Sequence, residues 1–209
     1  MSRATPTYQE IYALELINSY FDMFGDLVVS DKPDIISKDK RFGIEVTSGL
    51  SENDEKAVVF TKHIDNRQLP IERKKKLVGW LETYDKYKDR LPAAYHDDGY
   101  LHILSDRINK KRSKVAGYEK TEQIGLFVST EIINKPQSSL YEYIKVFESN
   151  QDVFSFLILD VRNWAYVIYI DTSTKKVFNY KNRQIEIMSI AKDKYDNPHN
   201  ILFDTTSEE

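Results

Sequence analysis

Two carboxylates, Asp34 and Glu45, flank a short charged turn in the stretch DKPDIISKDKRFGIEVTSGL, residues 31–50. If the residues KDKR (38–41) form a four-residue hairpin loop, Asp34 faces Glu45 across the two strands. Like charges that lie directly opposite each other on paired strands are destabilising. The spacing therefore predicts either a polar, solvated hairpin or a cation held between the two acids.

Side chains alternate between the two faces of a strand, which divides the hairpin into an apolar and a polar face. The apolar set, which we expect in the core, is Ile35, Ile44 and Val46. The polar set is Asp34, Glu45 and Thr47. Two opposed carboxylates suit magnesium (or manganese), a hard cation held by one or two carboxylates together with water and phosphate. A register slip of one residue would exchange the two faces.

The elements that must position these acids follow from hydrophobic periodicity. Residues 7–24 predict a helix that opens with a Thr7–Glu10 capping box and ends at Gly25. Its apolar stripe is Leu14, Ile17, Phe21 and Phe24. Residues 27–37 and 42–48 predict the two strands of the hairpin.

The rest of the chain alternates helices and apolar strands. We expect a helix at 100–119, a strand at 124–130 and a helix at 138–150. The segments FSFLILDV, WAYVIYID and KVFNYK then predict a β-rich C-terminal part. Residues 51–99 are polar, end in the loop-like LPAAYHDDGY, and predict a helical insertion. This order predicts one α/β domain over 1–209, a mixed central sheet flanked by helices on both faces.

Composition removes several classes of protein. The 209 residues carry a net charge of -3 and no cysteine, which excludes disulfides and thiolate zinc sites. We expect no signal peptide and no membrane span, and hence a cytoplasmic location. The four histidines show no metal-binding spacing, and no phosphate-binding glycine loop or GxSxG motif is present.

At the two acids the sequence resembles the PD-(D/E)XK (restriction-endonuclease-like) nuclease superfamily. The resemblance rests on PD at Pro33–Asp34, on IEVT at Ile44–Thr47, and on a lysine-rich helix, IxxKxxKxxxY at 108–118, that leads into an apolar strand. It covers roughly residues 8–50 and 100–130. It implies a restriction-endonuclease-like core and divalent-metal cleavage of phosphodiesters, with Asp34 and Glu45 as the metal ligands.

The sequence departs from the motif at Thr47, where the family has a lysine. Thr47 has no charge to orient a nucleophilic water or to stabilise the transition state. Three lysines are alternatives: Lys111, Lys114 and Lys32. We favour Lys111, because relatives of this fold can supply the charge from the following helix and because a lysine on an apolar stripe needs a charged partner. Glu10 could complete the metal site, although its capping role explains it without a metal.

Two basic blocks, ERKKK (72–76) and RINKKRSK (107–114), could follow a phosphate backbone, although solvated helix faces would look the same. Their candidate nucleic-acid-binding residues are Arg73, Lys74, Lys75, Lys110, Lys111, Arg112 and Lys114. The expected function is magnesium-dependent hydrolysis of DNA by a nuclease with a displaced lysine.

Two alternatives stay open. One is a catalytically inactive nuclease-fold protein that binds nucleic acid or a protein partner, for example in bacterial or phage defence or counter-defence. The other is a purely structural module in which the acids are incidental. Many nucleases of this class act as dimers, so a homodimer is also among the expected partners.

Overall fold

The computed structural model describes residues 5–49, 97–115, 117–118, 121–130, 145–146, 148–149 and 152–201. The insertion expected at 51–99 lies outside this part of the chain except for its last three residues, which begin a helix. Of the helix expected at 138–150, the structure describes only residues 145, 146, 148 and 149, and the first three of these are helical. The candidates Arg73, Lys74 and Lys75 also lie outside the described residues.

The strands of the described residues form one seven-stranded mixed sheet whose spatial order follows the chain. They are β1 Leu27–Val29, β2 Ile35–Ser37, β3 Phe42–Ser48, β4 Gln123–Thr130, β5 Phe156–Val161, β6 Tyr166–Asp171 and β7 Lys175–Asn179. The three central strands β3, β4 and β5 run parallel, and every other pair is antiparallel. The mixed α/β sheet expected from the sequence is therefore confirmed.

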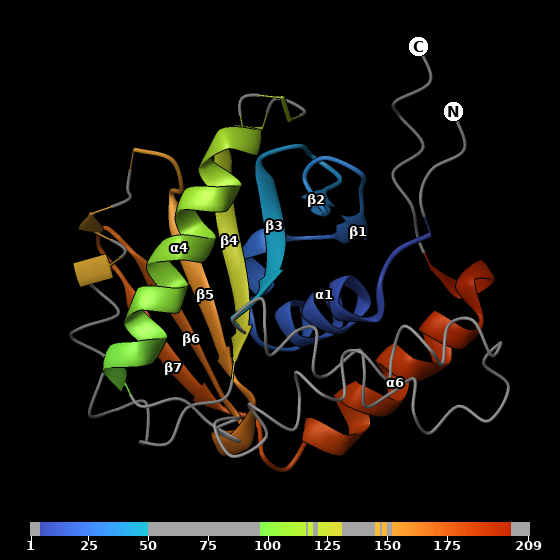
Figure 1. Cartoon of the computed structure of the whole chain (residues 1–209). Helices are drawn as coiled ribbons and strands as arrows, with labels where there is room; N and C mark the ends of the chain where they lie inside the picture. Colours follow the sequence, from blue (N-terminus) through green and yellow to red (C-terminus); the bar gives the residue numbers. More distant parts are fainter. Residues whose placement is uncertain are drawn as a thin grey trace, which may run out of the picture.

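Helices cover both faces of this sheet. They are α1 Tyr8–Tyr20, α4 Asp97–Val115 and α6 Gln184–Asp196. Helix α4 crosses one face, whereas α1 and α6 lie on the other (Figure 1). One core joins α1 and α6 to β-strand side chains that include Ile44, Phe127 and Ile158. A second core packs Leu104 and Ile108 of α4 against the opposite face.

The first helix forms as its sequence predicts and ends earlier. Thr7 is the N-cap, and its capping box with Glu10 is complete. The predicted stripe, Leu14, Ile17, Phe21 and Phe24, is buried. The α-helix stops at Tyr20 and a 3₁₀ turn, Asp22–Phe24, follows. Gly25 has a φ of 66°, which favours glycine and turns the chain toward β1.

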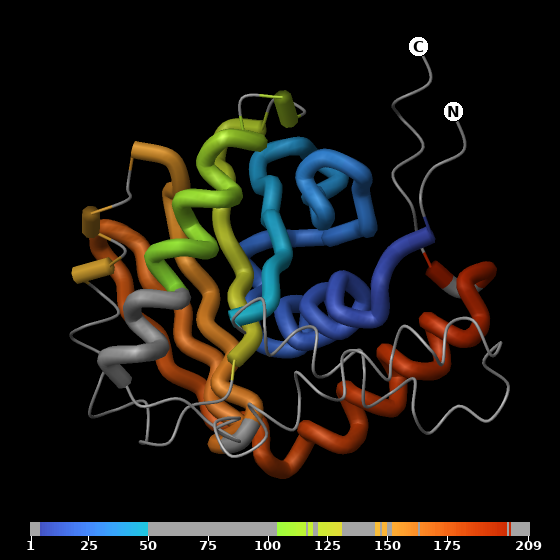
Figure 2. The backbone as a smooth tube through the Cα atoms, in the orientation of Figure 1, coloured from blue at the N-terminus to red at the C-terminus, as the bar shows by residue number. Residues whose placement is uncertain are grey.

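The hairpin register is confirmed for Ile35 with Ile44 and for Ile36 with Gly43, whereas the expected pair Asp34–Glu45 lies beyond the end of this ladder. The prediction of a single strand at 27–37 is wrong. This segment forms two strands, β1 and β2, which pair antiparallel with each other through Val28 and Ile36. The break falls around Pro33, which has no N–H to continue a ladder. Figure 2 shows the chain curling at this edge of the sheet, beside α1.

Two further helix boundaries correct the prediction. Helix α4 spans 97–115, so it begins inside the expected loop and ends before 119. The prediction of a β-rich C-terminal part contains no helix, whereas the structure has helix α6 after KVFNYK. Its segment QIEIMSI alternates like a strand, and Arg183 provides no side-chain cap. The helix is held by burial of Ile187 and Ala191 and by the Lys194–Glu15 ion pair with α1.

Among the helices of the described residues, none combines the length and the apolar composition that crossing a membrane requires.

Candidate functional site

The site lies where β2 leaves the edge of β3. Their pairing stops at Ile35 and Ile44, so the backbone of Val46 has no strand partner on that side. The side chain of Asp34 takes the missing place, and its Oδ2 accepts a hydrogen bond of 2.7 Å from the Val46 N–H. Asp34 is thereby held against the backbone of Val46, the residue that follows Glu45.

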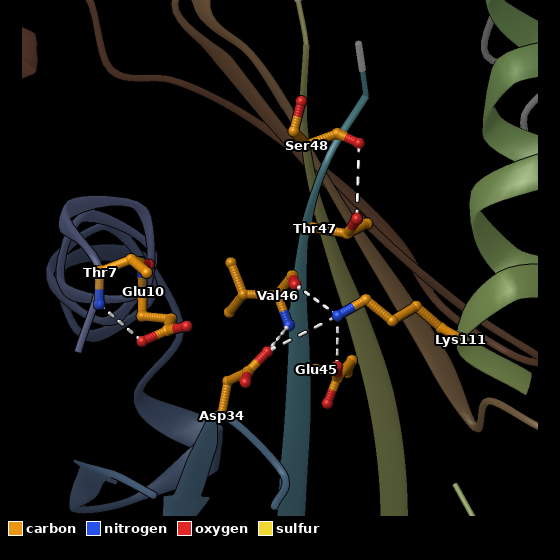
Figure 3. A network of polar contacts seen from close by, with 8 residues as sticks. All are labelled: Thr7, Glu10, Asp34, Glu45, Val46, Thr47, Ser48 and Lys111. Carbon is orange, nitrogen blue, oxygen red and sulfur yellow. Dashed lines mark hydrogen bonds and ion pairs between the residues drawn. The ribbon is translucent and has the colours of Figure 1, made fainter. Parts of the chain in front are cut away.

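Lys111 reaches this edge from α4. Its ammonium donates to Glu45 Oε1 and, at 3.1 Å, to the Val46 carbonyl oxygen. It also lies 4.0 Å from Asp34 Oδ2. Figure 3 shows the lysine and the two acids converging on one point beside β3. The Glu45 side chain is 5% exposed and that of Lys111 is 17% exposed, so water screens this ion pair only weakly.

The acid pair has unusual electrostatics. Burial, and then the nearby charge of Glu45, raise the pKa of Asp34 to about 7, although the Val46 N–H and Lys111 act against the shift. Asp34 therefore changes charge near neutral pH. A cation nearby favours the ionised form of a carboxyl group that is buried beside another acid, so it makes loss of the proton easier.

Glu10 and Thr47 lie beside this centre without joining the contacts of Lys111. The Glu10 carboxylate accepts a hydrogen bond of 2.8 Å from the Thr7 N–H, which closes the capping box. Its charge also contributes to the raised pKa of Asp34, and Figure 3 shows the Glu10 carboxylate on the α1 side of Asp34. Thr47 is buried, and its hydroxyl makes only a long contact of 3.5 Å to the Ser48 carbonyl.

Of the three lysines that could replace a lysine at position 47, the structure brings only Lys111 to the acids. Lys32 is exposed in the bend before β2, outside the strand pairing. Lys114 and Lys110 are exposed on α4, and Arg112 pairs with Asp152. Arg112 and Lys114 lie in the last turn of α4, where cations also stabilise the helix dipole, and this is an alternative reason for these two residues.

The donor atoms fit a hard divalent cation with few protein ligands. Two carboxylates and one backbone carbonyl surround the ammonium of Lys111, which itself marks a position where positive charge is stabilised. Magnesium is usually bound by one or two carboxylates and keeps several waters. Within the described residues, no cluster of three or more His, Cys, Asp or Glu side chains suits a metal.

The sequence did not predict that Tyr118 would lie near the acids. Its hydroxyl is buried and has no hydrogen bond of ordinary geometry, although Glu45 lies close enough to raise the pKa of the phenol. Burial is the larger cause of that shift. The sequence predicts Tyr118 inside the helix at 100–119, and it lies instead three residues beyond the end of α4 at Val115.

A second polar cluster, centred on Asp160, was also missed. The fully buried Asp160 carboxylate accepts hydrogen bonds from Ser129 Oγ at 2.6 Å, from Arg162 Nε at 3.4 Å and from Tyr180 Oη. Tyr180 in turn contacts Tyr12 of α1, with 3.2 Å between their hydroxyl oxygens. This cluster is on the α1 face of the sheet, away from α4. An aspartate inside the apolar strand FLILDV was the signal that could have found it.

Comparisons with models of protein families, with curated proteins and with solved structures found no match to this chain. Any functional interpretation therefore rests on the geometry of the chain itself.

Proposed function

We propose that this chain is a divalent-cation-dependent nuclease of the PD-(D/E)XK type that hydrolyses phosphodiester bonds in DNA. The observation that carries the proposal is the convergence of Lys111 on Asp34 and Glu45, since these residues come from an α-helix and from two different parts of a hairpin. The restriction-endonuclease-like core is part of the proposal. It is supported by the order of α1, β2, β3, α4 and β4 around the acids.

The acids and the Val46 carbonyl would hold the cation. Bound magnesium or manganese supplies Lewis-acid polarisation of the scissile phosphate and lowers the pKa of an attacking water. In the free protein, Lys111 neutralises the acids, whose mutual repulsion would otherwise be costly in a buried position. An ammonium has three donors, so Lys111 can bind a phosphate oxygen when the acids hold a metal.

Lys111 would then supply the charge that Thr47 cannot. A positive group fixed beside the reacting phosphate stabilises the negative charge that grows in the transition state. The exposed Lys110 and Lys114 lie on the same helix and would contact the phosphate backbone on either side. The substrate would thus be held by α4 and cleaved at the edge of β3.

One observation favours a second function. The Lys111–Glu45 ion pair satisfies the acid pair without any metal, as would be expected in a nuclease fold that no longer cuts. Such a protein would bind nucleic acid or a protein partner through the same face. Bacterial or phage defence or counter-defence would be a fitting role.

Cleavage of linear, supercoiled and single-stranded DNA with magnesium or manganese tests the proposal. Asp34→Asn should abolish metal-dependent cleavage. The matched control is Asp26→Asn, since Asp26 is exposed and pairs with Lys38 on the surface, and this variant should cut at the wild-type rate. Cleavage by Asp34→Asn at the wild-type rate would refute the assignment. Absence of any cleavage, with a magnesium-dependent rise in Tm, would favour the second function.

A further inference from the structure

Arg162 is the first residue after β5 and begins a short 3₁₀ turn. Its side chain is 37% exposed, whereas that of its partner Asp160 is fully buried. The guanidinium donates through Nε to Asp160 Oδ2 at 3.4 Å. Its central carbon also lies over the ring of Tyr12 of α1, 4.8 Å from the ring centroid. A buried acid and an aromatic face therefore hold this guanidinium in place at the surface.

Stability alone does not explain the arrangement around Asp160. Moving a carboxylate out of water costs free energy, so a buried ion pair is weak evidence for a stabilising role. Asp160 already accepts hydrogen bonds from the Ser129 hydroxyl, at 2.6 Å, and from the Tyr180 hydroxyl. An arginine that neutralises a carboxylate frequently does so with two parallel N–H bonds. Within the described residues, Arg162 makes one, and it is longer than the two hydroxyl contacts.

This geometry leaves the outer edge of the guanidinium for a ligand. Among the described residues, none accepts a hydrogen bond from Nη1 or Nη2 of Arg162. These two nitrogens form a planar fork of donors that matches the oxygens of a phosphate. The backbone of Arg162 is held as well, because Gln184 Nε2 of α6 donates to its carbonyl oxygen at 2.9 Å. A fork that is already ordered loses less side-chain entropy when it binds an anion.

The register of the sheet relates Arg162 to the proposed cation site. Ser48, Ser129 and Asp160 are direct neighbours across β3, β4 and β5. Strands lie about 4.8 Å apart and rise about 3.3 Å per residue, so the Cα atoms of Asp160 and Val46 are about 12 Å apart. One strand of duplex DNA advances about 3.4 Å per nucleotide, so this distance corresponds to about three or four nucleotides.

We infer that Arg162 binds a backbone phosphate of the nucleic-acid substrate through Nη1 and Nη2, a few nucleotides from the phosphate at the acids. The inference rests on the proposed function for the identity of its ligand. The contact is independent of base sequence, because phosphates position a nucleic acid without specifying it. It lies on the α1 side of the sheet, whereas Lys110 and Lys114 contact the backbone from α4.

Binding of a labelled oligonucleotide, single-stranded or duplex, to the full chain in EDTA tests this contact without cleavage. Arg162→Gln removes the charge, and Arg162→Lys keeps the charge without the fork. Tm in EDTA is measured for each variant, because Arg162→Gln leaves Asp160 without its cation. The matched control is Arg183→Gln. Arg183 also lies over a tyrosine ring of α1, 5.8 Å from the centroid of Tyr20, but its donors bind Glu186.

Arg162→Gln should weaken duplex binding about 10- to 100-fold and reduce the slope of log affinity against log salt by about 1. Arg162→Lys should weaken binding with a Tm and a salt slope like those of the wild type, and it decides the test if Arg162→Gln melts early. Arg183→Gln should bind DNA normally.

Wild-type affinity in Arg162→Lys and Arg162→Gln would overturn the inference, as would an equal loss in Arg183→Gln. If the wild type cuts DNA with magnesium while both Arg162 variants bind it normally, the proposed function stands and this contact does not. If the wild type never cuts but binds DNA, and both Arg162 variants bind it more weakly, the contact stands and cleavage is refuted.

Discussion

Lys111 Nζ lies 4.0 Å from Asp34 Oδ2, and the same ammonium donates to Glu45 and to the Val46 carbonyl. Helix α4 therefore delivers positive charge to the point where β2 separates from β3. In the PD-(D/E)XK motif that the sequence resembles, that charge belongs two residues after the second acid, where this chain has Thr47. The relationship explains how the acids can be buried together.

The stability of the free protein should depend on Lys111. Lys111→Met leaves Glu45 buried without its cation, and breaking a buried ion pair in this way typically costs about 3–5 kcal/mol. Lys38→Met removes only an exposed pair with Asp26, which is worth about 0–1 kcal/mol. Urea denaturation in EDTA measures both. Equal losses in the two variants would show that the site is not held by this ion pair.

Asp34 should make the protein less stable as the pH rises. Its folded pKa of about 7 is above its unfolded value, so the folded state binds more protons in this interval and stability falls as pH rises from about 4 to about 7. Asp34→Asn should show a smaller fall over this range. It should also melt above the wild type at pH 8 in EDTA. Parallel pH curves for the two proteins would contradict the raised pKa.

Binding of DNA should depend on salt through the exposed lysines of α4. In the Asp34→Asn background, which should not cleave, the double variant Lys110→Gln/Lys114→Gln should weaken binding. It should also reduce the slope of log affinity against log salt by about 2, because each substituted lysine would no longer neutralise a phosphate. The control is Lys175→Gln/Lys176→Gln, which changes two exposed lysines of β7. Equal effects of the two double variants on DNA affinity and on its salt dependence would show that α4 is not part of the DNA interface.

The Asp160 cluster should stabilise the fold without affecting the site. Tyr180→Phe removes one donor from a fully buried carboxylate and should cost about 1–3 kcal/mol. Because the cluster lies on the face of the sheet covered by α1, magnesium affinity should stay at the wild-type value. Thermal denaturation of Tyr180→Phe measures the loss of stability, and magnesium titration of the same variant measures the affinity for the cation. A large loss of magnesium affinity would show that the two faces are coupled.

Local pattern predicted the parts of the fold that local chemistry determines. The Thr7–Glu10 capping box, the turn at 38–41 and the Ile35–Ile44 register all follow from a few neighbouring residues, and all are present. The sequence also placed Lys111 on the buried stripe of its helix, because a lysine among apolar residues needs a partner. The contact of Lys111 with the Val46 carbonyl required the three-dimensional fold.

The errors have a common physical origin in tertiary packing. Helix α6 buries Ile187 and Ala191, which lie one helical turn apart, but the apolar residues of QIEIMSI alternate as in a strand and Ile185 is 83% exposed. Contacts with α1, including Lys194–Glu15, decide its conformation. The partners Ser129 and Tyr180 of Asp160 likewise come from other parts of the sequence. The break at Pro33 is the exception, because it follows locally from a residue without an N–H.

The most direct test of the account is the rate of magnesium-dependent DNA cleavage by Lys111→Met and by the double variant Thr47→Lys/Lys111→Met, with Lys38→Met as the control. Loss of a group that stabilises transition-state charge typically lowers the rate about 10²–10³-fold, and we predict this for Lys111→Met. A lysine at position 47, on the same face of β3 as Glu45, should restore part of the rate, and Lys38→Met should cut normally. A wild-type rate in Lys111→Met would contradict the claim that α4 supplies the missing lysine.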